Sequence, residues 1–213
     1  MSKQLGKAEP EYSDPDGNGV GFLRKNENLY SLRRRIDELI TGTFVSGARF
    51  VMSDDIICEL HSICMNGLLP EAGRYRTEPV SLSNGYIPPP AVEVPGLMRD
   101  FCDFVNHEWE SRDLIWWCSF CLWRINWIHP FVNGNGRTAR ELGYLAMNIK
   151  FGGALPKKNS IIEQIMRTKP DFEAALTFAD SQHLLGRPYD MSLSAMDSYV
   201  SDILTKQLQA NLR

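Results

Sequence analysis

The chain has 213 residues, of which 43% are hydrophobic, enough for one folded domain with a buried core. Its formal net charge is -3 at pH 7, and this lack of a basic excess argues against direct nucleic-acid or membrane partners. The five cysteines show no disulfide spacing and residues 1–12 form no apolar leader, so we expect a cytoplasmic protein.

Taken in chain order, residues 1–26 are polar and rich in proline and glycine, which predicts a flexible N-terminal arm. The folded domain with its flanking helices should then occupy residues 27–213. Helical spacing of Leu32, Ile36 and Leu39 predicts the first helix. A second helix should start after Ser53, which is a suitable N-cap followed by an acidic first turn.

Residues 80–86 have a different pattern. Val80 and Leu82 alternate with polar residues, and the pair Asn84-Gly85 favours a type I′ turn. This predicts a small β-hairpin, which the prolines at 88–90 should keep short because they donate no backbone hydrogen bonds.

Helical patterns follow at residues 94–111, 114–128, 136–150, 160–168, 170–180 and 191–209. The segment 114–128 is apolar on nearly all sides, as is typical of a helix at the centre of a bundle. The predicted fold class is therefore all-α, a helical bundle with one small β-hairpin.

The most informative segment is the loop between the helices predicted at 114–128 and 136–150. Pro130 should stop the first helix at His129, and Gly134 and Gly136 allow a ligand to approach the main chain. The following helix should begin at about Gly136, so the N–H groups of its first turn and its positive dipole end would face the loop. This arrangement suits a phosphate group.

Charged side chains strengthen that interpretation. Arg137 and Arg140 lie three residues apart on one helix face, and arginine can bind phosphate bidentately. His129 can act as a general base, because an imidazole titrates near neutral pH. Each feature alone is typical of ordinary structure, but together within twelve residues they favour phosphate chemistry.

The string from His129 to Arg140 resembles the signature HPFx[D/E]GNGRxxR of the Fic family. Residues 73–76 and 87–90 resemble the segments that flank the flap of that family, and the likeness extends over about residues 54–208. The resemblance implies the Fic-fold helical bundle, with the hairpin as its flap.

The resemblance also implies an activity, namely transfer of AMP from ATP to a Ser, Thr or Tyr hydroxyl of a target protein. His129 would deprotonate the hydroxyl, and Phe131 would anchor the loop. The remaining roles fall to two groups. Phosphates would be bound by Asn133, Gly134, Asn135, Gly136, Arg137 and Arg140. The target segment would be held by strand addition to Leu82, Ser83, Asn84, Gly85 and Tyr86.

One position departs from the family pattern. Asn133 stands where the family has an acidic ligand for Mg²⁺, and its amide oxygen can ligate Mg²⁺ or Mn²⁺ without supplying charge. Two alternatives to AMP transfer therefore stay open: a nucleotide-binding protein of this fold with weakened catalysis, and transfer of another nucleotide such as UMP.

Two further features bear on partners and metals. The inhibitory motif [ST]xxxE[GN] of the family is incomplete, because Glu27-Asn28 supplies its end but Leu23 replaces the hydroxyl residue. Restraint would then come from a separate small antitoxin-like protein, or be absent. Cys58, His61 and Cys64 recur every three residues without a second ligand pair, which indicates core packing and not zinc.

Overall fold

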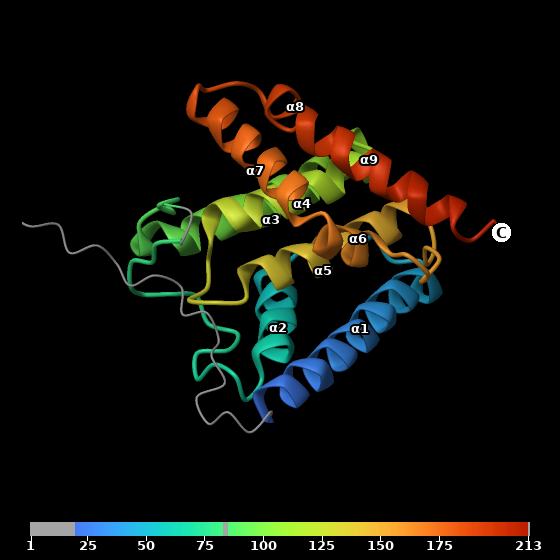
Figure 1. Cartoon of the computed structure of the whole chain (residues 1–213), viewed down its shortest axis with the longest axis horizontal. Helices are drawn as coiled ribbons and strands as arrows, with labels where there is room; N and C mark the ends of the chain where they lie inside the picture. The colour runs from blue at the N-terminus through green and yellow to red at the C-terminus, as the bar shows by residue number, and fades with distance from the viewer. Residues whose placement is uncertain (1–19, 83–84, 213) are drawn as a thin grey trace, which may run out of the picture. The chain divides into compact units, whose positions relative to one another are not determined.

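The computed structural model describes residues 20–82 and 85–212, which are mostly helical (Figure 1). The chain divides into two compact units. The first unit contains Met1–Ile36, Val51–Trp109 and Ile125–Thr138, and the second contains Asp37–Phe50, Glu110–Arg124 and Ala139–Arg213.

The helices follow one another along the chain with few long connections. They are α1 (Val20–Ser46), α2 (Asp54–Met65), the 3₁₀ turn η1 (Ala91–Glu93), α3 (Val94–Glu108), the 3₁₀ turn η2 (Trp109–Ser111), α4 (Leu114–Ile128), α5 (Asn135–Phe151), α6 (Ile161–Arg167), α7 (Lys169–Leu184), α8 (Tyr189–Ser192) and α9 (Ser194–Gln209).

Local capping fixes several of these boundaries. Ser53 accepts a hydrogen bond from the backbone N–H of Ile56, so the predicted N-cap of α2 is confirmed. Asp113 caps α4 in the same way by accepting from the N–H of Trp116, at 2.9 Å. Gly152 follows the end of α5 with a φ of +83°, a conformation that glycine adopts readily.

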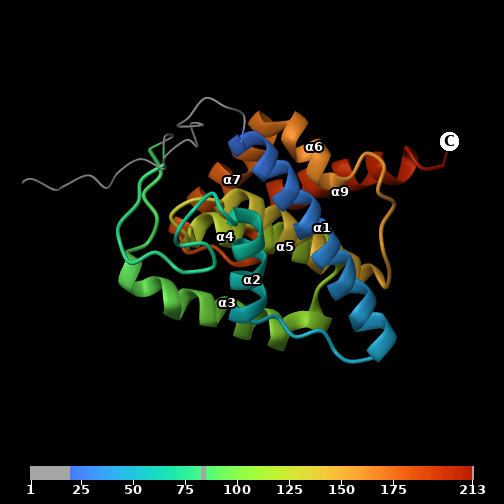
Figure 2. The same ribbon diagram turned by 90° about the horizontal axis from the view of Figure 1, so that it is seen from below.

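The first unit is built on α2 and α3, which contact each other (Figure 2). Ile57 and Leu60 of α2 and Phe101 of α3 are fully or almost fully buried there. Asn28 of α1 donates to the carbonyls of Cys64 and Asn66, at 3.1 and 2.8 Å, and so satisfies the C-terminal end of α2.

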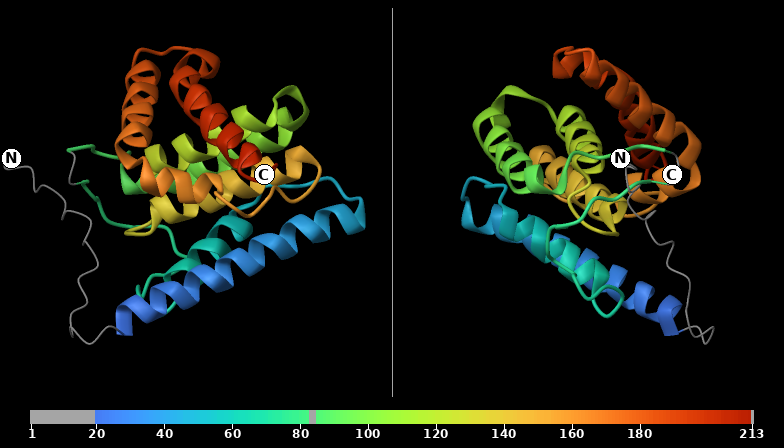
Figure 3. Two further views of the ribbon diagram at one scale, coloured as in Figure 1. Left: turned by 45° about the vertical axis from the view of Figure 1, so that its right-hand side comes forward. Right: turned by 90° about the vertical axis from the view of Figure 1, so that its left-hand side faces the viewer.

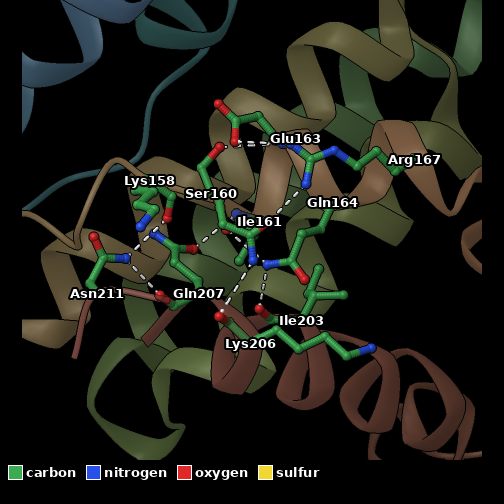
Figure 4. A network of polar contacts seen from close by, with 11 residues as sticks. Lys158, Ser160, Ile161, Glu163, Gln164, Arg167, Ile203, Lys206, Gln207 and Asn211 are labelled. Carbon is green, nitrogen blue, oxygen red and sulfur yellow. Dashed lines mark hydrogen bonds and ion pairs between the residues drawn. The ribbon is translucent and has the colours of Figure 1, made fainter. Parts of the chain in front are cut away.

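In the second unit α7 and α9 lie side by side and are joined through α8 (Figure 3). Trp123 of α4 donates to Asp180 of α7 at 2.9 Å. Two buried glutamines attach α6 and the residues before it to α9 (Figure 4). Gln164 donates to the carbonyl of Ile203, and Gln207 accepts from the N–H of Ile161.

Three expectations need revision. The predicted β-hairpin is not formed within residues 20–82 and 85–212. Two backbone hydrogen bonds close a turn there, from Gly85 to Leu82 and from Leu82 to Tyr86. Ser83 and Asn84 lie outside the described residues. No strand extends from this turn among its described neighbours, because prolines at 79 and 88–90 flank it and cannot donate to a ladder.

The other revisions concern boundaries. The arm predicted at 1–26 mostly lies outside the described residues, but its last part, from Val20, already belongs to α1. The single helix predicted over 191–209 is divided into α8 and α9 around Leu193. Within the part of the chain that the structure describes, no helix is both long and apolar enough to cross a membrane.

Candidate functional site

The loop between α4 and α5 belongs to the first unit and begins with an unusual backbone conformation. His129 has a φ of +52°, in the left-handed region that residues other than glycine seldom occupy. Such strain costs on the order of 1–3 kcal/mol and persists only where the surroundings fix it. The next residue is fixed in this way, because the carbonyl of Pro130 accepts from the backbone N–H of Arg76 at 2.8 Å.

The imidazole of His129 is oriented by the end of α4. Its Nδ1 lies 3.3 Å from the carbonyl oxygen of Asn126, which can only accept a hydrogen bond. In the neutral ring Nδ1 therefore carries the hydrogen and Nε2 carries the lone pair. The residue is only 3% exposed, so most of it is shielded from bulk water. Nε2 is thus the ring atom that can accept a proton.

Arg76 holds the same end of α4 from the side of the preceding segment. Its guanidinium donates to the carbonyls of His129 at 2.7 Å, Pro89 at 2.6 Å and Ile128 at 3.4 Å. The last carbonyls of a helix have no partner within it, so this buried side chain satisfies groups that would otherwise be costly. Burial lowers the pKa of Arg76, yet a guanidinium remains charged in proteins.

Asn135, at the start of α5, closes the loop from within. Its side-chain amide donates to the carbonyl of Phe131 and accepts from the N–H of the same residue, both at 2.9 Å. The residue is 1% exposed. In the structure this side chain therefore bonds to the backbone of the loop, whereas the resemblance implies that it contacts phosphate.

Asn133 and Gly134 are joined by a hydrogen bond and lie close to α2. The side-chain oxygen of Asn133 accepts from the N–H of Gly134 at 2.6 Å. Gly134 has a φ of +83°, and a Cβ added to it would lie 2.8 Å from Sδ of Met65. Both the backbone angle and the close approach of α2 therefore require glycine here.

His61 of α2 contacts this loop directly, which the sequence did not indicate. The ring is fully buried and stacks on Phe131, with centroids 3.6 Å apart and an interplanar angle of 2°. Its Nε2 lies 2.8 Å from the carbonyl oxygen of Asn133, and its Nδ1 accepts from the N–H of Gly73 at 2.8 Å. The predicted burial of His61 is confirmed, but its hydrogen bonds to the loop were missed.

The first turn of α5 directly follows the loop. Gly136 and Arg137 are partly exposed there, and the hydroxyl of Thr138 bonds to the carbonyl of Gly134 at 3.1 Å. Arg140 stands three residues after Arg137 in the same helix and is also partly exposed. Backbone N–H groups in a first helical turn lack intrahelical partners, so this end of α5 suits an anion.

The loop fits a divalent cation poorly by itself. Across residues 20–82 and 85–212 no group of three or more His, Cys, Asp or Glu side chains converges as a metal site would require. The oxygen of Asn133 that would ligate Mg²⁺ is hydrogen-bonded to Gly134. Magnesium usually binds through carboxylates and substrate phosphates.

The Fic/DOC family matches residues 51–147, a range that contains the loop together with His61 and Arg76. This part of the chain is similar to Fic/DOC domains. Solved Fic structures agree in fold. A Fic domain containing signalling protein from Bacteroides thetaiotaomicron superimposes with a TM-score of 0.69 at 21% identity, covering 88% of this chain and 71% of that one. Fic-1 from C. elegans gives a TM-score of 0.65 at 24% identity, covering 92% and 53%.

Curated relatives are similar over shorter stretches. Protein adenylyltransferase Fic of Nematostella vectensis is 33% identical over 129 residues, which are 58% of this chain and 29% of that protein. The protein of the same name from Drosophila willistoni is 34% identical over 88 residues, 40% of this chain and 18% of that protein. The chain thus spans less than a third of the length of these relatives.

A turn near the end of α4 is attached to the segment that leads into this loop. The hydroxyl of Tyr86 donates to the carbonyl of Trp127 at 2.8 Å. This bond attaches the turn at Leu82, Gly85 and Tyr86 to the helix that precedes His129. The predicted flap residues that the structure describes are therefore connected to the segment that leads into His129, although they form no hairpin.

His61 makes the stability of the protein depend on pH. Burial lowers its pKa from 6.5 to about 4, and the Arg137 cation acts in the same direction, against the hydrogen bond to Asn133. Between these two pH values the unfolded chain binds a proton that the folded chain does not. We therefore expect full stability above pH 6.5 and a loss that reaches about 3 kcal/mol as the pH falls to about 4.

Urea unfolding at about pH 7, 5.5 and 4 measures this effect. The comparison with a His61→Gln variant isolates the contribution of His61, because carboxylates titrate in both proteins. The pH dependence should be shallower in the variant. Parallel curves for the two proteins would contradict the assignment of a neutral, buried His61.

Proposed function

We propose that this chain is a protein adenylyltransferase that transfers AMP from ATP to a Ser, Thr or Tyr hydroxyl of a target protein. The observation that carries the proposal is the position of His129, a shielded imidazole whose Nε2 carries the lone pair, in a loop that ends at the N-terminus of α5. The names of the curated relatives support it.

The proposed reaction is a single displacement. The hydroxyl oxygen of the target attacks the α-phosphorus of ATP while Nε2 of His129 takes its proton. The bond from the α-phosphorus to the oxygen that bridges to the β-phosphorus breaks, and pyrophosphate leaves. No covalent intermediate on the enzyme is needed.

We assign the stabilisation of the phosphates to the loop and to α5. The backbone N–H groups of Asn135 and Gly136 would bind the developing charge, because the N–H of Gly134 already bonds to Asn133 and the side chain of Asn135 to Phe131. Arg137 and Arg140 would hold the β- and γ-phosphates.

We assign docking of the target to the turn that contains Leu82, Gly85 and Tyr86, which Tyr86 attaches to α4. Since no strand extends from the described part of this turn, the contact would use its side chains and not strand addition. The five cysteines are all thiols, which supports a reducing compartment such as the cytoplasm.

Restraint by an internal glutamate has little support in the geometry of α1. Glu27, the nearest match to the inhibitory motif, pairs with Arg24 at 3.4 Å and is well exposed. We propose that an inhibitory carboxylate, where one acts, comes from a separate small antitoxin-like protein.

Incubation of the protein with cell extract and ATP labelled at the α-phosphate tests the proposed activity. Mg²⁺ and Mn²⁺ are supplied separately, and label on protein should survive denaturation. ATP labelled at the γ-phosphate is the control and should leave no label beyond that seen with extract alone. Parallel reactions with labelled UTP, GTP and CTP identify the preferred nucleotide.

A second candidate function is nucleotide binding with weakened catalysis. It is favoured by Asn133, whose neutral side chain bonds to the N–H of Gly134 and occupies one donor of the loop. Tight ATP binding without label transfer to any protein would support this candidate over the enzyme.

The phosphate assignment predicts that Arg137→Ala weakens binding of ATP more than binding of AMP. The guanidinium is assigned to the distal phosphates, and a charge-assisted hydrogen bond contributes about 1.5–3 kcal/mol. Calorimetry should therefore show a loss of at least about tenfold for ATP alone. Equal losses for the two nucleotides would place Arg137 elsewhere.

The departure at position 133 predicts a gain of function. The carboxylate introduced by Asn133→Asp can keep the bond to Gly134 with one oxygen and offer the other to Mg²⁺, whereas the asparagine offers only an NH₂ group there. We expect higher turnover than wild type at low Mg²⁺ and a smaller difference at saturating Mg²⁺. A ratio that stays constant across a Mg²⁺ titration would mean that Asn133 only caps the loop.

A further inference from the structure

We propose that His61 is a positioning residue for the phosphate-binding loop, and that it acts as one defined neutral tautomer. Its effect on AMP transfer rests on the proposed function, but its effect on the loop does not. His61 lies in α2, 68 residues before His129 in the sequence, and is fully buried.

The two hydrogen bonds of the ring determine where its hydrogen lies. Nδ1 faces the backbone N–H of Gly73 and must accept, so it carries no hydrogen. Nε2 faces the carbonyl oxygen of Asn133 and must donate, so it carries one. Protonation or the other tautomer would set a donor against the N–H of Gly73.

The ring of His61 also restrains the backbone of the loop. It stacks in parallel on Phe131, donates to Asn133, and would be 3.2 Å from a Cβ at Gly134. These residues precede the first turn of α5, whose N–H groups are assigned to phosphate. A shift of the ring would therefore move the backbone that binds the nucleotide.

On its other side, the ring holds the segment that supports the base. Gly73 has a φ of +80°, and a Cβ there would lie 2.9 Å from Cβ of Ser62. Three residues later, Arg76 bonds to the carbonyl of His129 at 2.7 Å. His61 thus connects the loop to the segment that positions the imidazole of His129.

Three substitutions separate the functions of the ring. His61→Gln places an amide N–H near Asn133 and retains the donor. His61→Asn retains only an acceptor near Gly73. His61→Phe retains the stacking but leaves the N–H of Gly73 and the carbonyl of Asn133 without a partner. Leu60→Ala is the matched control, because it destabilises the same helix through a fully buried neighbour.

The full chain is examined in four ways: amide hydrogen exchange of residues 133–136, ATP binding by calorimetry, transfer of labelled AMP, and ¹⁵N NMR of the His61 ring. NMR should show a hydrogen on Nε2 alone at about pH 7. A buried group left unpaired is costly, so in His61→Phe these amides should exchange about tenfold faster and ATP should bind about tenfold more weakly. His61→Asn should resemble His61→Phe, and His61→Gln should stay near wild type.

Several outcomes would overturn the proposal. The first is an NMR spectrum that places the hydrogen on Nδ1. The second is wild-type amide exchange and wild-type ATP affinity in both His61→Phe and His61→Asn. The third is a loss of ATP affinity in Leu60→Ala, measured below its melting temperature, that equals the loss in His61→Phe. Should His61→Phe fail to fold, the comparison of His61→Gln with His61→Asn gives the same decision. If exchange changes as expected but wild type transfers no AMP, the positioning of the loop stands and the proposed enzyme function fails.

Discussion

Replacement of His129 by alanine should lower AMP transfer by about 10²–10⁴-fold, the usual contribution of a general base. The substitution removes the imidazole, whose Nε2 carries the lone pair because Nδ1 points to the carbonyl of Asn126. ATP binding should persist, since the phosphates are assigned to the loop beyond Phe131 and to α5. The measurement is initial-rate labelling of the target, with calorimetry of ATP on the same protein.

The matched control is His107→Ala, which removes an exposed histidine from α3. It should label the target at the wild-type rate. The fold of the His129 variant is checked by circular dichroism and should be retained, because the bond from Arg76 ends on the backbone carbonyl of His129 and does not involve the imidazole. Labelling by His129→Ala at the wild-type rate would show that another group takes the proton.

The second large effect is expected at Arg76. In Arg76→Met the carbonyls of His129 and Pro89 lose donors that now lie at 2.7 and 2.6 Å. A buried group left unpaired costs about 1–3 kcal/mol, so the free energy of unfolding should fall by about that amount for the carbonyl of His129, with a smaller addition from the part-buried carbonyl of Pro89. Urea unfolding measures this loss.

Transfer should decrease as well, because His129 would no longer be fixed in its left-handed conformation. Arg74→Met is the control, since Arg74 carries the same charge in the same segment and is exposed. If both variants lose the same stability, the buried hydrogen bonds of Arg76 do not support the loop.

Features of the fold that depend on neighbouring residues could be predicted from the sequence, whereas features that also depend on distant residues could not. Ser53 acts on neighbouring residues, so the start of α2 that it sets was predicted from the local sequence. The hairpin prediction was wrong because the Asn84-Gly85 signal is local. A pair of strands also needs backbone N–H donors, which the flanking prolines lack.

The same distinction holds for the site. The loop from His129 to Arg140 is contiguous, so its residue types could be read together and compared with a family signature. His61 and Arg76 reach it from 72 and 53 residues away along the chain, by bonds to backbone carbonyls. Every residue has a backbone carbonyl, so the residue type at the accepting position does not indicate such a bond. These contacts therefore cannot be inferred from one sequence.

The partners of Arg76 have an electrostatic consequence. The hydrogen bonds of its guanidinium that the structure describes all end on backbone carbonyls, which are dipoles and leave the unit charge of the side chain uncancelled. A fixed positive potential therefore lies under the loop that is proposed to receive a triphosphate. Mobile ions screen a buried charge much less than an exposed one, so this attraction should persist at salt concentrations that suppress the pull of surface lysines and arginines.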